Sequence, residues 1–388
     1  MINYLEEWVF ARYGQEFYTP GLERIGRALR LLKPILQKSK ITIIAGTNGK
    51  GETTHRLSRL MSESTFCAWT SPHILSMTER FSSQDGDISS DDLEALILES
   101  DLIAQNEKLE LSYYEFLFFV FCRWAIQKRP QFLFLEVGLG GKFDAVNALD
   151  ANLVLLTSIS RDHQEFLGPR YDLILKEKLG VLRPTTPLIH FLELKYLRER
   201  IHHTGPQLDL SLFSPLTPSE FSLRNQFLAY AASCHLKNIP FRPGNWRPSE
   251  EKLFARGEIV SSANEWQLYG SHNVDGMRKL IQFLQSANYN FEASPFKAVV
   301  TSFSKRNEKD LRVMLKMLKS ANLGEVLVTS FEHTKAYPKE ALRDLCSQEG
   351  LKFVEDISDH VQGWTHQKIL VVGSYYFLGQ LKPLLSSQ

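Results

Sequence analysis

The chain has 388 residues, of which 43% are hydrophobic, so it is long enough for two ordinary domains with sizeable cores. Its net charge of +1 argues against a nucleic-acid or membrane surface as the main partner. The four cysteines form no Cys-x-x-Cys pair, the N-terminus lacks a signal-type apolar core, and the longest apolar run is too short to cross a bilayer. We therefore expect a cytoplasmic protein.

The first predicted strand and the turn after it are the most informative segment. Residues 41–45 are apolar and mostly β-branched, residues 46–51 form a glycine-rich turn, and apolar residues then recur at helical spacing. A strand, a glycine turn and a helix N-terminus cradle phosphate, because glycines let backbone N–H groups approach the anion and the helix adds a partial positive charge. The expected contacts are Gly46, Thr47, Asn48, Gly49, Gly51 and, as a point charge on the terminal phosphates, Lys50.

The residue after this turn departs from the usual phosphate loop. Glu52 stands where a hydroxyl group normally meets Mg²⁺. Three alternatives follow. Thr53 or Thr54 supplies the hydroxyl after a shift of one residue, Glu52 itself contacts the metal, or nothing replaces the missing group.

The next elements read as a parallel α/β sheet with candidate metal ligands at its edge. Residues 113–127 predict a crossover helix, and residues 132–135 and 153–158 predict buried parallel strands. Glu136 ends the first of these strands, at the edge where open parallel sheets bind ligands, and its carboxylate suits Mg²⁺. The alternative is an ion pair with Lys142. His163, with Asp162 before it, follows the next strand and is a second candidate ligand, although a histidine is more often a structural hydrogen-bonding group.

The pattern breaks near residues 235–256, where prolines and polar residues gather, and then restarts. Helices are expected at 277–284 and 310–318, strands at 298–301, 325–329 and 369–372, and Pro338 is expected at the first position of another helix. We therefore predict a P-loop nucleotide-binding α/β domain with a mostly parallel sheet over residues 1–254. A smaller Rossmann-like α/β domain is predicted over residues 255–388. Asn273, with His272 before it, opens the second domain's first helix and either contacts a ligand or caps the helix.

Taken together, the motifs resemble the folylpolyglutamate synthases and dihydrofolate synthases, which are related to the Mur ligases. The resemblance runs in order through almost the whole chain. It rests on residues 21–24, the glycine turn 46–51, Ser71-Pro72-His73 with residues 79–81, residues 136–141 with Asp144, residues 157–159 with Asp162 and His163, Glu177-Lys178 with Gly180, Arg256, residues 270–273 and residues 373–375.

The resemblance implies an ATP- and Mg²⁺-dependent ligase that adds L-glutamate to a folate or dihydropteroate through an acyl phosphate. It implies catalytic roles for Lys50, for a carbamylated Lys178 and for His272. Sequence chemistry alone treats Lys178 as a solvated lysine. The resemblance implies three metal ligands, which are Glu136, His163 and Thr53. It adds to the nucleotide contacts Thr53, Asn225, Arg256 and His272. It implies as substrate contacts Ser71, Pro72, His73, Arg80, Asp162 and Ser374. We expect a monomer.

Three departures from the family pattern leave alternatives open. Besides Glu52, Tyr269 stands where the family has an aspartate in its second-domain motif, and Val274 replaces the proline. These departures motivate a second hypothesis, a non-catalytic relative that binds a nucleotide or a pterin. A third hypothesis is a Mur-type cell-wall ligase, which the spacing of the glycine turn and Ser71-Pro72-His73 disfavour.

Overall fold

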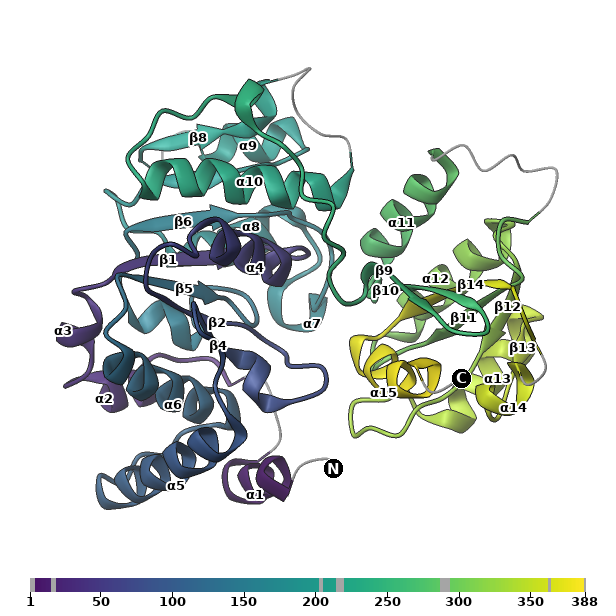
Figure 1. Ribbon diagram of the computed structural model, residues 1–388, viewed down its shortest axis with the longest axis horizontal. Helices are drawn as coiled ribbons and strands as arrows, with labels where there is room; N and C mark the ends of the chain where they lie inside the picture. The colour runs from purple at the N-terminus through teal and green to yellow at the C-terminus, as the bar shows by residue number, and fades with distance from the viewer. Residues whose placement is uncertain are drawn as a thin grey trace. The chain divides into compact units, whose positions relative to one another are not determined.

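The computed structural model describes residues 4–14, 19–201, 205–213, 220–286, 294–361 and 364–386. The chain divides into two compact units, residues 1–249 and 250–388, and each has its own sheet (Figure 1). Each unit therefore buries a separate core. Within the described residues, no helix is both long and apolar enough to cross a membrane.

The first unit is built on an eight-stranded sheet in the order β4-β3-β2-β5-β1-β6-β7-β8. The strands β2, β5, β1, β6, β7 and β8 are parallel, and the hairpin β3–β4 adds an antiparallel edge. The strands are β1 (Lys40–Ala45), β2 (Phe66–Trp69), β3 (Phe81–Ser83), β4 (Gly86–Asp87), β5 (Phe132–Glu136), β6 (Leu153–Leu156), β7 (Leu188–His190) and β8 (Gln207–Asp209).

Helices cover both faces of this sheet, as a doubly wound fold requires. They are α1 (Tyr4–Tyr13), α2 (Glu23–Leu29), α3 (Lys33–Leu36), α4 (Lys50–Leu60), α5 (Ser90–Asn106), α6 (Tyr113–Lys128), α7 (Gln164–Leu167), α8 (Tyr171–Lys178), α9 (Lys195–Ile201) and α10 (Phe221–Leu236). Short 3₁₀ helices lie at η1 (Met77–Arg80), η2 (Ala145–Ala148), η3 (Leu179–Val181), η4 (Leu210–Phe213) and η5 (Pro243–Asn245).

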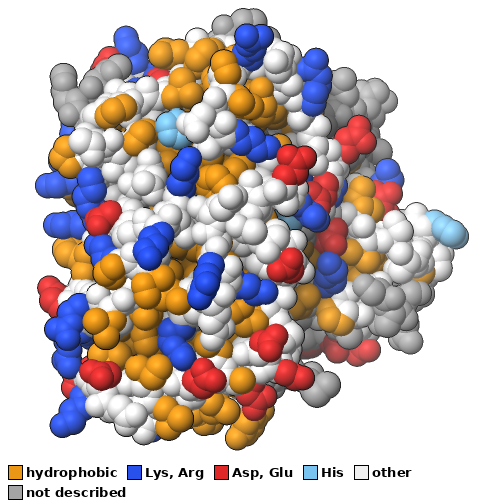
Figure 2. Space-filling view, turned by 60° about the vertical axis from the view of Figure 1, so that its left-hand side comes forward, with side chains coloured by type: hydrophobic (Ala, Val, Ile, Leu, Met, Phe, Trp, Pro, Cys, Tyr) orange, Lys and Arg blue, Asp and Glu red, His pale blue; other side chains and the backbone are white. Residues whose placement is uncertain are grey.

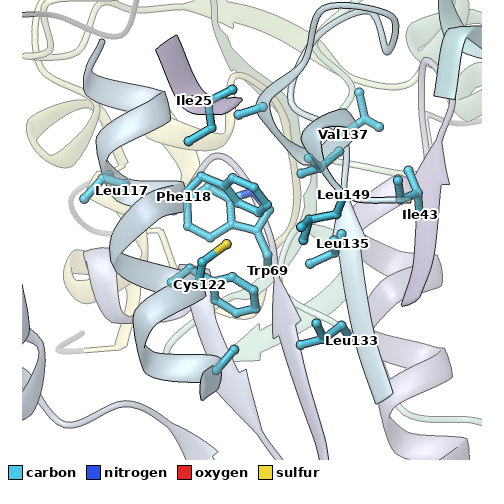
Figure 3. Close-up of a cluster of buried hydrophobic side chains, with 14 of the residues drawn as sticks. Ile25, Ile43, Trp69, Leu117, Phe118, Cys122, Leu133, Leu135, Val137 and Leu149 are labelled. Carbon is cyan, nitrogen blue, oxygen red and sulfur yellow. The ribbon is translucent and has the colours of Figure 1, made fainter. Parts of the chain in front are cut away.

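The main core of the first unit lies between α6 and the sheet. Alternate residues of β5, Leu133 and Leu135, face α6, and Trp69 of β2 joins them with Phe118 and Cys122 (Figure 3). The opposite residues, such as Phe134, face α4 and α10 in a second core. Both faces of the central strands are thus apolar, which explains why these strands read as unbroken hydrophobic runs.

The second unit has a six-stranded sheet in the order β13-β12-β11-β14-β10-β9, parallel except for β9. Its strands are β9 (Arg256–Ser261), β10 (Glu265–Tyr269), β11 (Ala298–Ser302), β12 (Glu325–Val328), β13 (Lys352–Phe353) and β14 (Lys368–Gly373). Its helices are α11 (Val274–Ser286), α12 (Glu308–Ser320), α13 (Lys339–Glu349), α14 (Ile357–Val361) and α15 (Tyr375–Ser386).

The predicted fold class is confirmed: both sheets are mostly parallel and alternate with helices. One detail was wrong, because Pro338 is the cap residue before α13 and not its first helical residue. The surface carries no dominant charge in the view of Figure 2, where lysine and arginine side chains are interspersed with acidic and apolar ones. This mixture agrees with the net charge of +1.

The core predicts a large local effect at β5. Leu135→Ala removes a fully buried side chain that faces α6, so we expect it to lower the free energy of unfolding of the first unit by about 2–5 kcal/mol. Denaturant titration measures this change. Leu98→Ala, at an exposed position of α5, is the matched control and should change stability by less than about 0.5 kcal/mol. Equal effects of the two substitutions would contradict the assigned core.

Candidate active site

The glycine turn after β1 adopts the conformation that the sequence pattern requires. Gly46 has φ 147°, and a Cβ atom on it would lie 1.9 Å from Thr157 Oγ1, so only glycine fits there. Gly49 has φ 90° and is the cap residue of α4. The turn is tied to the end of β6, because Thr47 N–H donates to Ser158 O at 2.8 Å and Thr157 Oγ1 donates to Asn48 O at 2.7 Å. The backbone is therefore shaped before any ligand binds.

The side chains of Glu52, Thr53 and Thr54 lie in the first turn of α4, where a phosphate loop usually has its metal-binding hydroxyl. Glu52 is buried and turns towards α10, where its carboxylate accepts hydrogen bonds from Ser222 Oγ and from Asn225 Nδ2. Thr54 Oγ1 donates to Lys50 O. Thr53 Oγ1 is buried and has no hydrogen-bond partner within the described part of the chain. The geometry is compatible with Thr53 as the hydroxyl that meets the metal, and this role stays a prediction.

Lys50 lies over the turn itself. Its Nζ donates to Thr47 O at 3.1 Å, so the amine already sits beside the backbone that would hold phosphate. An ammonium group in this place supplies a point charge for terminal phosphates. The contact of Lys50 with terminal phosphates stays a prediction.

Glu136 lies at the end of β5, in register with Ile44 of β1 and hence next to the start of the glycine turn. Its Oε2 accepts a hydrogen bond from Ser71 N–H at 3.1 Å, and the buried Ser71 Oγ has no partner among the described residues. A carboxylate and an unpaired hydroxyl side by side are oxygen ligands of the kind that Mg²⁺ prefers. The sequence reasoning gave Ser71 a substrate role only; its place after β2, the neighbour of β5, was the available signal.

His163 follows β6 with φ 50° and keeps about half of its side chain exposed. Burial of the rest lowers the pKa of its imidazole, while the charges of Asp162 and Glu165 oppose this. The neutral imidazole is the form that binds a metal. Within the described ranges no three His, Cys, Asp or Glu side chains converge into a metal site. A cation here would need hydroxyl groups, water or phosphate oxygens as further ligands, which fits Mg²⁺.

Lys178 is not the solvated lysine that its sequence surroundings suggest. It ends α8 with only 4% of its surface exposed, and its Nζ donates to Gly46 O at 2.8 Å. The pKa of its amine is lowered to about 7, mainly by burial and also by the charge of Lys50, although nearby carboxylates, led by Asp162, act in the opposite direction. An amine of this pKa is partly neutral at physiological pH and therefore nucleophilic.

Two glycines bring the segment after Glu136 against the end of α8. A Cβ atom on Gly141 would lie 2.9 Å from Lys178 O, and one on Gly180 would lie 2.4 Å from Lys142 Cβ. The backbones are joined by a hydrogen bond from Lys142 N–H to Glu177 O at 2.9 Å. This close approach places Lys178 beside the glycine turn.

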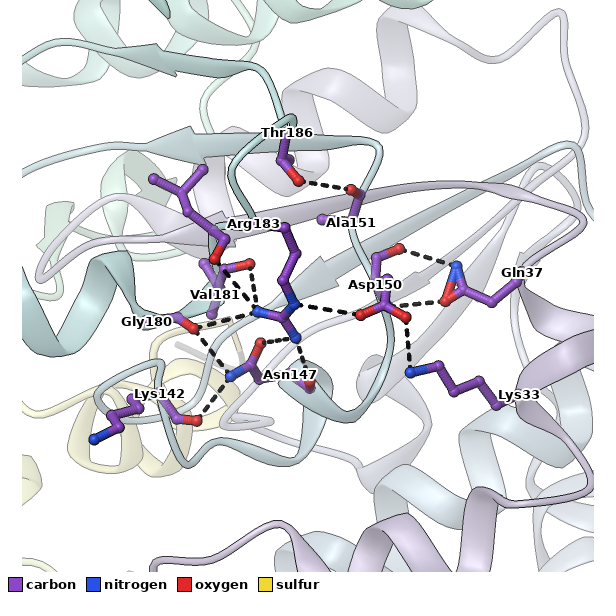
Figure 4. A network of polar contacts seen from close by, with 11 residues as sticks. Lys33, Gln37, Lys142, Asn147, Asp150, Ala151, Gly180, Val181, Arg183 and Thr186 are labelled. Carbon is purple, nitrogen blue, oxygen red and sulfur yellow. Dashed lines mark hydrogen bonds and ion pairs between the residues drawn. The ribbon is translucent and has the colours of Figure 1, made fainter. Parts of the chain in front are cut away.

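A polar network holds the segment that follows Lys178 (Figure 4). Asn147 Nδ2 donates to Lys142 O at 2.7 Å and to Gly180 O at 3.2 Å. Arg183 donates to Asn147 Oδ1 at 3.1 Å and pairs with Asp150 at 3.4 Å. These bonds satisfy the backbone carbonyls of the turn and fix the end of α8.

The loop of Ser71, Pro72 and His73 contacts Arg80, but Arg80 lies beneath it. Arg80 Nε donates to His73 Nδ1 at 2.8 Å, and its guanidinium lies over the ring of Trp69 at 5.8 Å. His73 Nε2 lies 3.0 Å from Glu6 of α1. Arg80 is almost fully buried, so its geometry supports the loop from inside.

In the second unit, Arg256 and His272 approach the same ring. The guanidinium of Arg256 lies 5.6 Å from the centre of Tyr375, and the His272 ring lies 5.4 Å from it. Ser374 Oγ is hydrogen-bonded to Ser304 Oγ at 2.7 Å. Asn273 Oδ1 accepts a hydrogen bond from Gly276 N–H at 2.8 Å. Asn273 therefore caps the N-terminus of α11, which was one of its two expected roles. These residues gather where β10 and β14 end.

Comparison with known proteins gives one consistent result. No family model matches the chain. A dihydrofolate synthase/folylpolyglutamate synthase of Bacillus subtilis is 25% identical over 94% of this chain and 95% of its own length. A dihydrofolate synthase/folylpolyglutamate synthase of Haemophilus influenzae is 34% identical, and this match covers 44% of this chain and 38% of that protein.

The structural comparison extends over the whole chain. A crystal structure of a bifunctional folylpolyglutamate synthase/dihydrofolate synthase with Mn, AMPPNP and L-glutamate bound has a TM-score of 0.81. The match has 22% identity and covers 99% of this chain and 98% of that one. The two proteins therefore share their fold.

The close approach of Gly180 to Lys142 predicts that adding one methyl group at Gly180 lowers the stability of the protein. Gly180→Ala would place a Cβ atom 2.4 Å from Lys142 Cβ and 2.6 Å from Lys142 Cα, so we expect the free energy of unfolding to fall by about 1–3 kcal/mol. Denaturant titration is the measurement. Gly26→Ala is the control, because no atom lies within 4 Å of its Cβ position on α2. A Gly180 variant as stable as the Gly26 variant would show that the contact is not tight.

Proposed function

We propose that this chain is an ATP-dependent ligase, because over 94% of its length it is similar to a dihydrofolate synthase/folylpolyglutamate synthase of Bacillus subtilis. It joins L-glutamate to a folate or a dihydropteroate. The observation that carries the proposal is the hydrogen bond from Lys178 Nζ to Gly46 O, with Glu136 at the neighbouring strand end. A phosphate loop, an acidic strand end and a low-pKa lysine meet at one edge of the sheet.

The proposed reaction has two steps. A substrate carboxylate oxygen attacks the γ-phosphorus of ATP, and the bond to ADP breaks. The glutamate amine then attacks the acyl carbon of this acyl phosphate, phosphate leaves, and the amine nitrogen loses a proton. Related structures support the ligands, since one holds AMPPNP and L-glutamate with Mn, and a structure of E. coli FolC holds DHPP and ADP.

The residues of the glycine turn would hold the nucleotide. Backbone N–H groups of residues 46–51 and the N-terminus of α4 bind phosphate oxygens, and Lys50 orients the terminal phosphates. Glu136 and the free hydroxyls of Ser71 and Thr53 supply oxygen donors that suit Mg²⁺. The assignment of His163 rests on the resemblance, since imidazole is an uncommon ligand of Mg²⁺. Bound Mg²⁺ would offset charge on the phosphates during transfer.

The remaining assignments of the proposal follow the resemblance. The loop of Ser71, Pro72 and His73, with Asp162, binds the pterin-containing substrate, and the buried Arg80 supports this loop from beneath. Ser374 binds glutamate, and Asn225, Arg256 and His272 bind ATP. We further propose a monomer in the cytoplasm, where a reducing environment suits four buried cysteines that are all unpaired.

The proposal is tested by measuring ADP release from ATP and Mg²⁺ with glutamate and either dihydropteroate or a reduced folate. We expect turnover that requires both glutamate and a pterin. Calorimetry on the same protein reports whether ATP binds. Binding of ATP without product after long incubation would contradict the ligase proposal. It would favour the nucleotide-binding relative that Glu52 motivates.

Lys178 has a specific expected role as a carbamate. Its neutral amine attacks CO₂, an N–C bond forms, and the proton goes to solvent, which turns a buried amine into a carboxylate-like group. Because burial lowers the pKa to about 7, the neutral fraction, and with it the carbamate, should rise between about pH 6 and pH 8. The ¹³C resonance of the carbamate in protein equilibrated with labelled bicarbonate measures this.

Two variants complete the Lys178 test. Lys178→Ala should abolish the ¹³C signal and reduce turnover by at least about tenfold, with partial rescue by a short carboxylate. Lys176→Ala, at an exposed position of the same helix, should change neither. Normal turnover of the Lys178 variant would rule out the role.

A further inference from the structure

The carboxylate of Glu79 gathers the backbone of the loop that follows β2. Its Oε1 accepts hydrogen bonds from Leu75 N–H at 2.8 Å and from Ser76 N–H at 2.9 Å, and its Oε2 accepts one from Ile74 N–H at 2.8 Å. Three successive backbone N–H groups that converge on one anion make a strong, charge-assisted contact. Glu79 belongs to η1, whose cap residue is Ser76, so the loop is closed on the short helix that follows it.

The two ends of this loop are attached to the strand ends of the first sheet. Thr70, directly after β2, donates from its Oγ1 to Glu79 O at 2.8 Å. Ser71 N–H donates to the carboxylate of Glu136 at the end of β5, at 3.1 Å. Residues 71–76 are therefore held between the strand end that carries Glu136 and the helix that carries Glu79.

The side chain of His73 is turned into the protein. An arginine side chain only donates hydrogen bonds, so Arg80 Nε donates to a His73 Nδ1 that carries no hydrogen, at 2.8 Å. The ring hydrogen therefore lies on Nε2, which donates to Glu6 Oε1 of α1 at 3.0 Å. His73 is 6% exposed, whereas Leu75 is 49% exposed. Both ring nitrogens of His73 are thus engaged inside the protein, and Leu75 stays on the outer surface of the loop.

We propose that Glu79 is a positioning residue, which holds residues 71–76 in one conformation before the pterin-containing substrate binds. The inference rests on the proposed role of this loop in substrate binding. A loop that is already ordered loses little conformational entropy when its ligand arrives, so it binds more tightly than a mobile loop. Glu79 acts through the backbone of the loop and does not touch the substrate.

The wild-type protein provides the first test, which needs no variant. Hydrogen exchange of the amides of Ile74, Leu75 and Ser76 is measured before and after dihydropteroate is added. In the free protein all three should exchange at least about tenfold more slowly than amides of an unstructured peptide, because each donates to a carboxylate. Exchange at the unstructured rate in the free protein would overturn the proposal, since the ligand would then order the loop.

Glu79→Gln gives the second test. The side chain keeps its length, but its NH₂ group must face at least one backbone N–H, donor against donor. The three amides should exchange faster, and the loop should occupy its binding conformation less often. A tenfold lower occupancy weakens the apparent affinity for dihydropteroate about tenfold, as measured by calorimetry with AMPPNP and Mg²⁺ present. The affinity for AMPPNP itself should not change. Glu94→Gln, at an exposed position of α5, is the control and should alter neither binding nor exchange.

The combination of exchange and binding decides between the explanations. Weaker dihydropteroate binding with unchanged amide exchange would overturn the positioning role, because Glu79 would then contact the substrate itself. Faster exchange with unchanged binding would show that the order of the loop does not serve the substrate. If Glu79→Gln does not fold, as judged by thermal unfolding, Glu79→Asp takes its place. Its shorter side chain cannot reach all three N–H groups, so it should produce the same two changes to a smaller extent.

These measurements also separate the inference from the ligase proposal, because neither of them reports turnover. A protein that binds dihydropteroate, loses this binding in Glu79→Gln and yet forms no glutamyl product would contradict the ligase function alone. A wild-type protein that binds no dihydropteroate would contradict both proposals.

Discussion

The buried amine of Lys178, held by the carbonyl oxygen of Gly46, connects the parts of the candidate site. The two residues are 132 positions apart, and the contact requires the end of α8 to reach the turn after β1. A lysine without access to water loses much of its preference for the charged form, which gives the first unit a nucleophilic amine near neutral pH. This contact thus joins the glycine turn to the buried lysine at the end of α8.

That contact is possible because three short segments approach each other at backbone distance. Gly46 lies against Thr157, Gly141 against the carbonyl of Lys178, and Gly180 against Lys142, and in each case a Cβ atom would not fit. The glycine-rich runs therefore have two uses. Gly46 and Gly49 give the turn after β1 its positive φ angles, whereas Gly141 and Gly180 allow close packing between the strand end of Glu136 and the helix of Lys178.

Glu52 shows how a departure from a motif can be accommodated. A carboxylate beside a triphosphate would repel its negative charge. The carboxylate of Glu52 instead accepts hydrogen bonds from Ser222 and Asn225 of α10. Thr53, one residue further along, keeps a free hydroxyl. The first turn of α4 therefore contains both an attachment to α10 and a hydroxyl without a partner among the described residues.

The sequence by itself determined the two-unit α/β fold, the glycine turn and the strand-end acid Glu136, because hydrophobic periodicity and glycine placement act over a few residues. It named Lys178 only through resemblance to a family, since nothing in its neighbourhood distinguishes it from other lysines. The burial of Lys178, the direction of Glu52, the free hydroxyl of Ser71 beside Glu136 and the inward position of Arg80 were decided by the tertiary structure alone. Each depends on partners distant in the chain, such as the 173 positions that separate Glu52 from Asn225, and local patterns carry no record of such contacts.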